Sequence, residues 1–147
     1  NKATFYALMG AIKDTEFTSL VYGAGWKIVS NIHRLPTQLG LEGDPYKIYY
    51  FGDIDAEGLS IWYSLYEKYQ VELAIPFYQA LLKKKYSIGK STQQKNKAAL
   101  EEFKSCFGEG NLGIIDELIH KEGYIPQEGL KQEKLVSIWR NSTWIFP

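Results

Sequence analysis

The first half of the chain alternates short apolar runs with stretches in which apolar residues recur at helical spacing. An apolar and aromatic run over 46–52 is typical of a buried strand, and similar runs lie at 19–22 and 71–75. The pattern predicts helices before and between these strands, at 1–12 (capped near Asn1), 26–35 and 56–69. This order predicts an α/β fold with a mainly parallel sheet flanked by helices.

The second half keeps the helical spacing, but the strand-like runs disappear. Asn111 is the expected cap of one of these helices, and Pro36 is expected to end the earlier helix that starts near Trp26. We therefore divide the chain into an α/β core over 1–90 and a helical C-terminal part over 91–147, packed on the same domain. The helices expected in the second half lie at 77–84, 95–107, 111–119 and 130–139.

Composition adds a few limits. The 147 residues suffice for one domain with its own core. Seventeen basic and seventeen acidic residues cancel, so any contact with nucleic acid requires a local patch. The single cysteine, Cys106, excludes a disulfide framework and a cysteine-rich zinc site. No run approaches the ~18 apolar residues that cross a membrane, and the start at Asn1 suggests a piece of a longer, cytoplasmic protein.

The strand over 46–52 runs into a pair of carboxylates, Asp53 and Asp55, followed by Glu57 and Gly58. The pair lies on a strand-to-helix turn, at the end of a strand where open α/β sheets bind ligands. Carboxylates this close repel each other unless a cation or hydrogen-bond donors hold them. Mg²⁺, or Mn²⁺ in its place, binds through one or two carboxylates together with water and phosphate oxygens. The pattern predicts a metal-dependent phosphate site, with Asp53 and Asp55 as catalytic ligands and Glu57 as a further ligand.

Simpler interpretations compete with this one. Asp and Gly are common in turns for backbone reasons alone. Asp55 is a good N-cap for the helix at 56–69, and Glu57 suits the first turn of that helix because of the helix dipole. A phosphatase of the haloacid-dehalogenase type also ends a strand with Asp-x-Asp, but Glu57 stands where that motif has Thr or Val. A cap role explains only one aspartate of the pair, so the metal site remains the leading hypothesis.

The same residues resemble a known family. Gly52-Asp53-Ile54-Asp55, with Gly58 and Leu59 behind it, is similar to the motif of Toprim domains, which topoisomerases, primases and related nucleases share. The stretch 50–59 most closely resembles the C-terminal Toprim region of the Wadjet anti-plasmid protein JetD, and is also similar to the type IIB topoisomerase A subunit. Further resemblance lies in 1–5, in 21–25 and, more loosely, in 124–130, which resembles a Glu-Gln-Glu-like stretch.

The resemblance implies a Toprim-like, Rossmann-like fold and Mg²⁺-dependent DNA cleavage within a larger defence complex. It also implies a glutamate at the end of a first strand, immediately before Asn1, which is absent from the 147 residues. We therefore expect that this strand lies upstream of Asn1. Residues 1–147 alone are then expected to show little or no cleavage activity.

Other residues receive secondary roles. Gly52 and Gly58 are expected to let backbone and phosphate approach closely. Lys2 is expected either to contact the scissile phosphate or to be an ordinary solvated lysine. A basic cluster is expected to follow a DNA backbone, with a merely solvated surface as the alternative. This cluster consists of Lys83, Lys84, Lys85 and Lys90.

Three functions stay open at this point. The first is a Mg²⁺-dependent DNA nuclease module of a Wadjet-type subunit, whose partners are DNA, the other subunits and a second copy of the chain. The second is a DNA-passage module like that of type IIB topoisomerases, which needs a tyrosine on a winged-helix domain that these residues lack. The third is a non-catalytic interaction module in which the aspartates are only structural.

Overall fold

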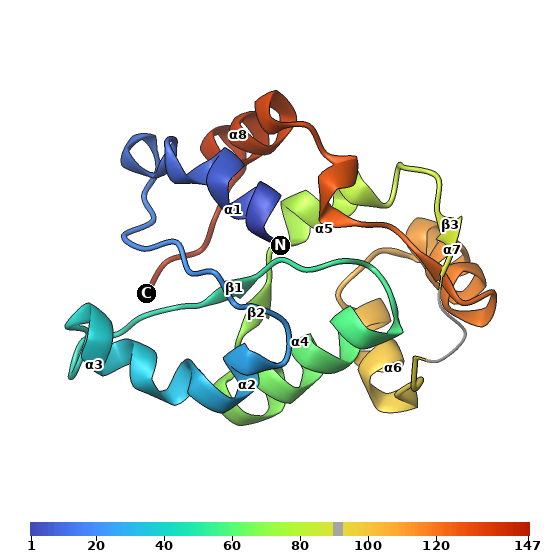
Figure 1. The fold of residues 1–147 in the computed structure, drawn as a ribbon, viewed down its shortest axis with the longest axis horizontal. Helices are drawn as coiled ribbons and strands as arrows, with labels where there is room; N and C mark the ends of the chain where they lie inside the picture. Colours follow the sequence, from blue (N-terminus) through green and yellow to red (C-terminus); the bar gives the residue numbers. More distant parts are fainter. Residues whose placement is uncertain (90–92) are drawn as a thin grey trace.

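The structure is a computed structural model that describes residues 1–89 and 93–147, and most of its elements are helices (Figure 1). The strands are short and come in two pairs. The α-helices are α1 (Lys2–Met9), α2 (Lys27–Asn31), α3 (Leu35–Leu39), α4 (Ala56–Tyr69), α5 (Ile75–Leu81), α6 (Lys97–Ser105), α7 (Glu109–His120) and α8 (Gln132–Asn141). The 3-10 helices are η1 (Ile12–Asp14), η2 (Ile32–Arg34) and η3 (Gln127–Gly129). The strands are β1 (Tyr49–Tyr50), β2 (Glu72–Leu73), β3 (Ser87–Ile88) and β4 (Gly123–Tyr124).

The centre of the molecule is the parallel pair β1 and β2, in which Tyr49 is opposite Glu72 and Tyr50 is opposite Leu73. Helix α4 connects the two strands, as parallel pairing requires. The second pair, β3 and β4, is antiparallel and lies beside α7. The prediction of parallel pairing between 46–52 and 71–75 is therefore confirmed, although the ladder is shorter than those runs.

Helices cover the central strands from two sides (Figure 1). On one side α8 packs against α1 and α5, and on the other α4 packs against α2 and α6. The arrangement is thus a small α/β sandwich rich in helix. A wide Toprim-like parallel sheet is not observed among the described residues, because the ladder involves only β1 and β2.

Helix α4 shows why the local sequence forms this structure. Asp55 begins it as N-cap and accepts a hydrogen bond from the Gly58 N–H at 2.6 Å. Its apolar stripe buries Trp62 and Leu65, and Gln70 ends the helix in the left-handed region, with φ of 54°. The Trp62 indole N–H also donates to the carbonyl of Val71 at 3.0 Å, which ties the helix to the start of β2. The predicted bounds, 56–69, agree with the structure.

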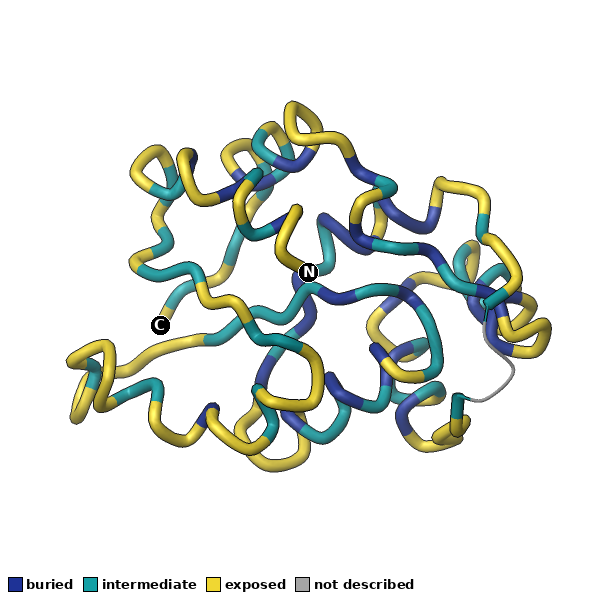
Figure 2. Tube along the Cα trace, in the orientation of Figure 1, coloured by how far each residue is buried: buried dark blue, intermediate teal, exposed yellow. Residues whose placement is uncertain are grey.

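The main core joins residues from both ends of the chain. Its largest fully buried side chains include Trp62, Tyr78 and Phe103, and Trp139 near the C-terminus belongs to the same cluster. Figure 2 shows this buried material running through the middle of the trace, whereas the stretch over α2 and α3 is mainly exposed. Among the described residues, no helix is long and apolar enough to cross a membrane.

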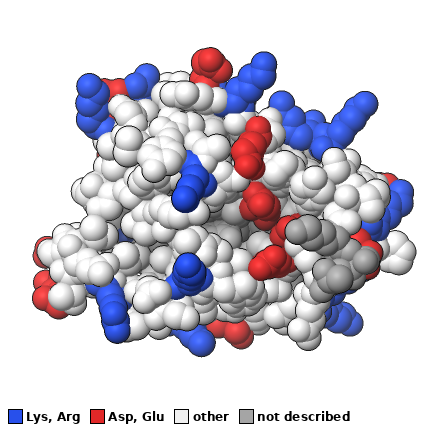
Figure 3. All heavy atoms as spheres, viewed as in Figure 1, with Lys and Arg blue, Asp and Glu red and all other residues white. Residues whose placement is uncertain are grey.

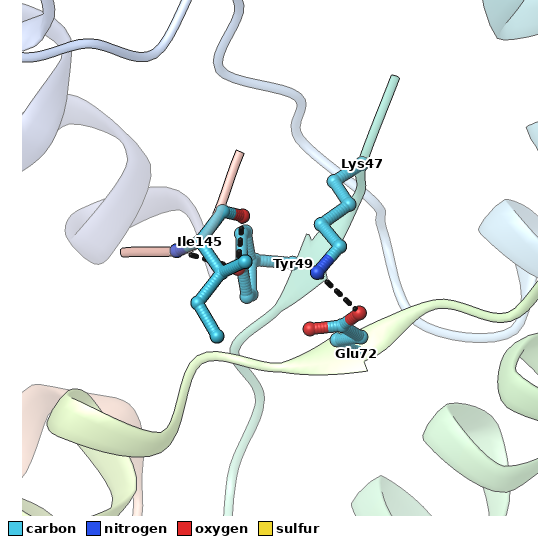
Figure 4. A network of polar contacts seen from close by, with 4 residues as sticks. All are labelled: Lys47, Tyr49, Glu72 and Ile145. Carbon is cyan, nitrogen blue, oxygen red and sulfur yellow. Dashed lines mark hydrogen bonds and ion pairs between the residues drawn. The ribbon is translucent and has the colours of Figure 1, made fainter. Parts of the chain in front are cut away.

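The C-terminal tail is fastened to β1 (Figure 4). The Tyr49 hydroxyl donates to the carbonyl of Ile145 at 2.7 Å and accepts from the Ile145 N–H at 3.2 Å. Trp144 packs edge-on against both Tyr49 and Phe17, with ring centroids 5.2 and 5.1 Å apart. Beside these contacts, Lys47, two residues before β1, forms an ion pair of 2.9 Å with Glu72 of β2. The tail therefore closes one end of the central strands.

The expected strand at 19–22 is not formed. Residues 18–22 are not assigned to a helix or strand, and in the described part of the chain their main-chain groups have no hydrogen-bond partner. Residues 18–22 and 46–51 both line an apolar cavity of about 370 Å³. A strand requires a neighbouring strand, and among the described residues 18–22 have none.

Two predicted helix boundaries were also wrong. Pro36 does not end a helix but lies in the first turn of α3, where its missing N–H costs nothing. Helix α7 begins at Glu109 with Gly108 as N-cap, so Asn111 lies inside its first turn instead of capping it. Both errors arise because these residue types are compatible with the first turn of a helix as well as with its ends.

Candidate functional site

The end of β1 is held by partners from distant parts of the chain. The Gly52 N–H donates to the buried Tyr78 hydroxyl at 2.8 Å. The buried Gln127 side chain donates to the carbonyl of Phe51, and the Gln127 N–H donates to Asp53 Oδ1 at 2.8 Å. Ile54 also exchanges two main-chain hydrogen bonds with Ile125. The segment that leads into η3 therefore crosses the end of β1 and fixes the position of Asp53.

Asp55 has both of its carboxylate oxygens engaged. Oδ1 accepts from the Gly58 N–H as the cap of α4, and Oδ2 accepts from the Gln93 side-chain amide at 2.9 Å. The structure thus confirms the cap interpretation for Asp55. It also leaves Asp53 unexplained by any cap, as the sequence suggested.

The two glycines serve the turn itself. A Cβ at Gly58 would meet the carbonyl oxygen of Asp53, and a Cβ at Gly52 would meet the ring of Tyr50. Both positions are buried. The close approach that requires glycine is therefore between parts of this chain, and approach of a phosphate to these positions stays a prediction.

The surroundings of this turn disfavour the ionised forms of Asp53 and Tyr50. The pKa of Asp53 is raised, mainly because burial penalises the carboxylate, with a smaller contribution from the negative charges of Asp55 and Glu128. The Gln127 N–H acts in the opposite direction. Burial, followed by Asp53, Asp55 and Glu57, likewise raises the pKa of the Tyr50 hydroxyl. An added cation at this position would relieve all of these penalties.

Two carboxylates, rather than a full acidic cage, are available for such a cation. Glu57 is exposed in the first turn of α4, and the exposed Glu128 accepts from the Asn1 side-chain amide. In the described part of the chain, no three Asp, Glu, His or Cys side chains converge closely enough to hold a metal. The donor set fits Mg²⁺, which keeps several waters and needs one or two protein carboxylates, better than it fits Ca²⁺ or Zn²⁺.

A cleft of about 1110 Å³ opens beside the acidic pair. Asp53, Asp55 and Glu57 line it together with Trp26 and the stretch 93–97. In Figure 3, acidic side chains follow one another across the middle of this face, at the edge of a hollow. The acids are thus reachable from solvent, as a phosphate substrate would require.

Lys2, Lys83, Lys84 and Lys85 are not among the described residues that line this cleft. Lys2 is exposed in the first turn of α1, and Lys83, Lys84 and Lys85 are exposed after the end of α5. Lys90 lies outside the described residues. Instead, Lys95 and Lys97 line the cleft.

The sequence did not reveal the residues from distant parts of the chain that contact Asp53 and Asp55. Gln127 and Gln93 bind Asp53 and Asp55 but lie 74 and 38 positions further along the chain. One signal pointed to the first, since 124–130 had been singled out by the family resemblance. Nothing in the local pattern around Gln93 indicates its partner, because a polar residue in a loop has many possible contacts.

The cap can be separated from the charge by substitution. We expect Asp55→Ala to lower the free energy of unfolding by about 1 kcal/mol, because the Gly58 N–H loses its acceptor. Asp55→Asn should leave stability almost unchanged, since Asn caps helices as well as Asp does. Urea denaturation of both variants measures the difference. Equal losses in the two variants would show that the charge, and not the cap, holds the turn.

The fold and the site together define a class: a helix-rich α/β domain with two half-buried aspartates at the carboxyl end of a parallel strand. The chain belongs to the family of the C-terminal region of the Wadjet protein JetD, whose family model matches residues 1–138. This relates it to the Wadjet defence system. Neither a curated protein nor a solved structure matches the chain.

Proposed function

We propose that this chain is the Mg²⁺-dependent, DNA-cleaving module of a Wadjet-type defence protein, built on a Toprim-like arrangement. The observation that carries the proposal is the half-buried Asp53 at the end of β1, which lines an open cleft together with Asp55 and whose pKa is raised mainly by burial. Burying such a charge is costly unless a bound cation repays it. Its location beside an open cleft favours a catalytic over a purely structural role.

Asp53 and Asp55 would hold the metal, with Glu57 acting through water. When bound, Mg²⁺ supplies positive charge that stabilises the charge developing on the phosphate oxygens during cleavage. The protein's own part is positioning. The Gln127 N–H orients Asp53, and the Gly58 N–H with the Gln93 amide orients Asp55, so neither carboxylate has to be ordered when substrate arrives.

The proposal includes a strand upstream of Asn1 that completes the site. The apolar cavity is lined by both 18–22 and 46–51; in the described part of the chain, 18–22 form no main-chain hydrogen bond and β1 pairs with β2 alone. Thr4 borders this cavity, and its buried hydroxyl has no hydrogen-bond partner among the described residues. Asn1 lies beside the segment that holds Asp53, because its side-chain amide donates to Glu128, the neighbour of Gln127. A strand filling the cavity and ending at Asn1 would bring one more side chain to the acids.

DNA, the other subunits of a defence complex and a second copy of the chain are the proposed partners, and the cytoplasm is the proposed location. A non-catalytic interaction module is the second candidate. It is favoured by the engagement of both Asp55 oxygens and by the lack of a three-acid cluster among the described residues.

The two candidates differ in one measurement. We expect the full-length protein to convert supercoiled circular DNA to nicked or linear forms with Mg²⁺ or Mn²⁺, and to stop when EDTA is added. Agarose gels of time courses, run with and without the other subunits, measure this. Cleavage that persists in EDTA, or none in any of these mixtures, would favour the interaction module.

A further inference from the structure

The cleft beside Asp53 and Asp55 is larger than those two residues need. Its volume of about 1110 Å³ exceeds the range of ~300–1000 Å³ usual for small-ligand pockets. Its remaining walls differ in chemistry, since one is formed by 93–97 and another contains Trp26. The cleft therefore has room for a ligand that extends past the acidic pair.

The wall formed by 93–97 carries positive charge. Lys95 and Lys97 are both exposed at the start of α6, and neither forms an ion pair with a carboxylate in the described part of the chain. The Lys95 ammonium donates to the carbonyl of His120 at 3.3 Å, which ties this side chain to the end of α7. Two lysines so placed attract anionic groups that flank the acidic pair.

Trp26 provides an aromatic surface in the same cleft. It is 47% exposed, whereas Trp62 and Trp139 are 1% and 4% exposed in the core. It follows the turn at Gly23–Gly25 and makes no aromatic contact among the described residues. An indole that faces a cleft instead of the core is available to stack on another flat ring.

We propose that this cleft binds a single, unpaired nucleic-acid strand, with Lys95 and Lys97 on its phosphates and Trp26 stacked on one of its bases. The inference rests on the proposed function, because it names the form of DNA that the same site takes. A charged groove combined with an aromatic platform is the general pattern of single-strand binding. The bases of an intact duplex are stacked on one another, so a duplex offers phosphates to the lysines but no free base face to Trp26.

Binding can be measured without cleavage. The full-length protein would carry Asp53→Asn and Asp55→Asn, in EDTA, and fluorescence anisotropy would follow a labelled oligothymidylate and a duplex of equal length. We expect Trp26→Ala to weaken oligothymidylate binding at least about fivefold, as loss of one stacked base does. Trp26→Phe should restore most of the loss, and duplex binding should change less than about twofold.

The lysines are tested through salt. Lys95→Gln and Lys97→Gln should each reduce the slope of log affinity against log salt by about 0.7, the contribution of one phosphate contact on a single strand. The matched control is Lys134→Gln, an exposed lysine of α8 that does not line the cleft, which should leave the slope unchanged.

Two results would overturn the inference. One is equal weakening of both probes by Trp26→Ala, and the other is a slope that responds to Lys134→Gln but not to Lys95→Gln. Failure of the proposed function is recognised separately, because it appears as absent Mg²⁺-dependent nicking by the unsubstituted protein. That result would leave the binding measurements as they are.

Discussion

Asp53→Asn in the full-length protein is expected to abolish metal-dependent DNA cleavage while leaving the fold intact. We expect a loss of activity on the order of 100-fold or more, since the site loses a charged group that acts on the reacting phosphate. Asn retains the oxygen that accepts from the Gln127 N–H, so the turn keeps its contact. Asp55→Asn should behave in the same way, because Asn also caps α4.

Although Asp53→Asn should lose activity, it should not lose thermal stability. The pKa of Asp53 is raised above 3.8, mainly by burial, so the folded protein binds this proton more tightly than the unfolded chain. The free energy of unfolding therefore falls as pH rises from about 3.8 through the raised pKa, and stays lower above it. Asp53→Asn lacks this ionisation and should melt at the same temperature or higher at neutral pH in EDTA.

Thermal melts across pH, with and without MgCl₂, check both parts. The unsubstituted protein should gain stability from Mg²⁺, and Asp53→Asn should gain much less. The exposed Glu133 in α8 offers a matched control, since Glu133→Gln also removes one negative charge. A large drop in melting temperature for Asp53→Asn would mean that the carboxylate is structural.

The second large effect concerns the strand proposed upstream of Asn1. A chain that carries this strand should bind Mg²⁺ more tightly than residues 1–147, melt several degrees higher and regain DNA cleavage. Each kcal/mol gained raises the melting temperature by roughly 2–4 °C for a chain of this size. The gain comes from filling the cavity of about 370 Å³ and from pairing the free main-chain groups of 18–22.

Calorimetric titration with Mg²⁺ measures the gain in metal affinity. Amide hydrogen exchange of 18–22 measures whether these residues become paired. A matched chain with a proline in the middle of the added strand is the control, because proline cannot donate to a ladder. Strong Mg²⁺-dependent cleavage by residues 1–147 alone would show that the proposed site, which needs a residue upstream of Asn1, is not the active site. Unchanged exchange at 18–22 would show that the strand lies elsewhere.

The sequence was most informative where structure depends on neighbouring residues. The bounds of α4 followed from its apolar stripe and from the Asp55 cap, and the cap of α1 at Asn1 was also confirmed. The parallel pairing of β1 and β2 followed from the alternation of patterns. These features are determined by contacts within a few turns or by a single crossover.

What the sequence could not reveal depends on distant partners. The run at 19–22 has the composition of a strand but no neighbour to pair with, and β3 and β4 are too short to leave a pattern. The environment of Asp53 depends on Gln127, which arrives through a crossing segment near the C-terminus. Propensity describes a segment in isolation, whereas pairing depends on which segments the fold places together.

The fastening of the C-terminal tail to β1 has a practical consequence for where this domain ends. The family match stops at residue 138, yet Trp139 lies in the core, and Trp144 packs on Tyr49 and Phe17 beyond that limit. A protein truncated at the limit of homology would leave the aromatic rings around β1 facing water and prone to self-association. The unit that folds therefore extends beyond the residues that the family model matches.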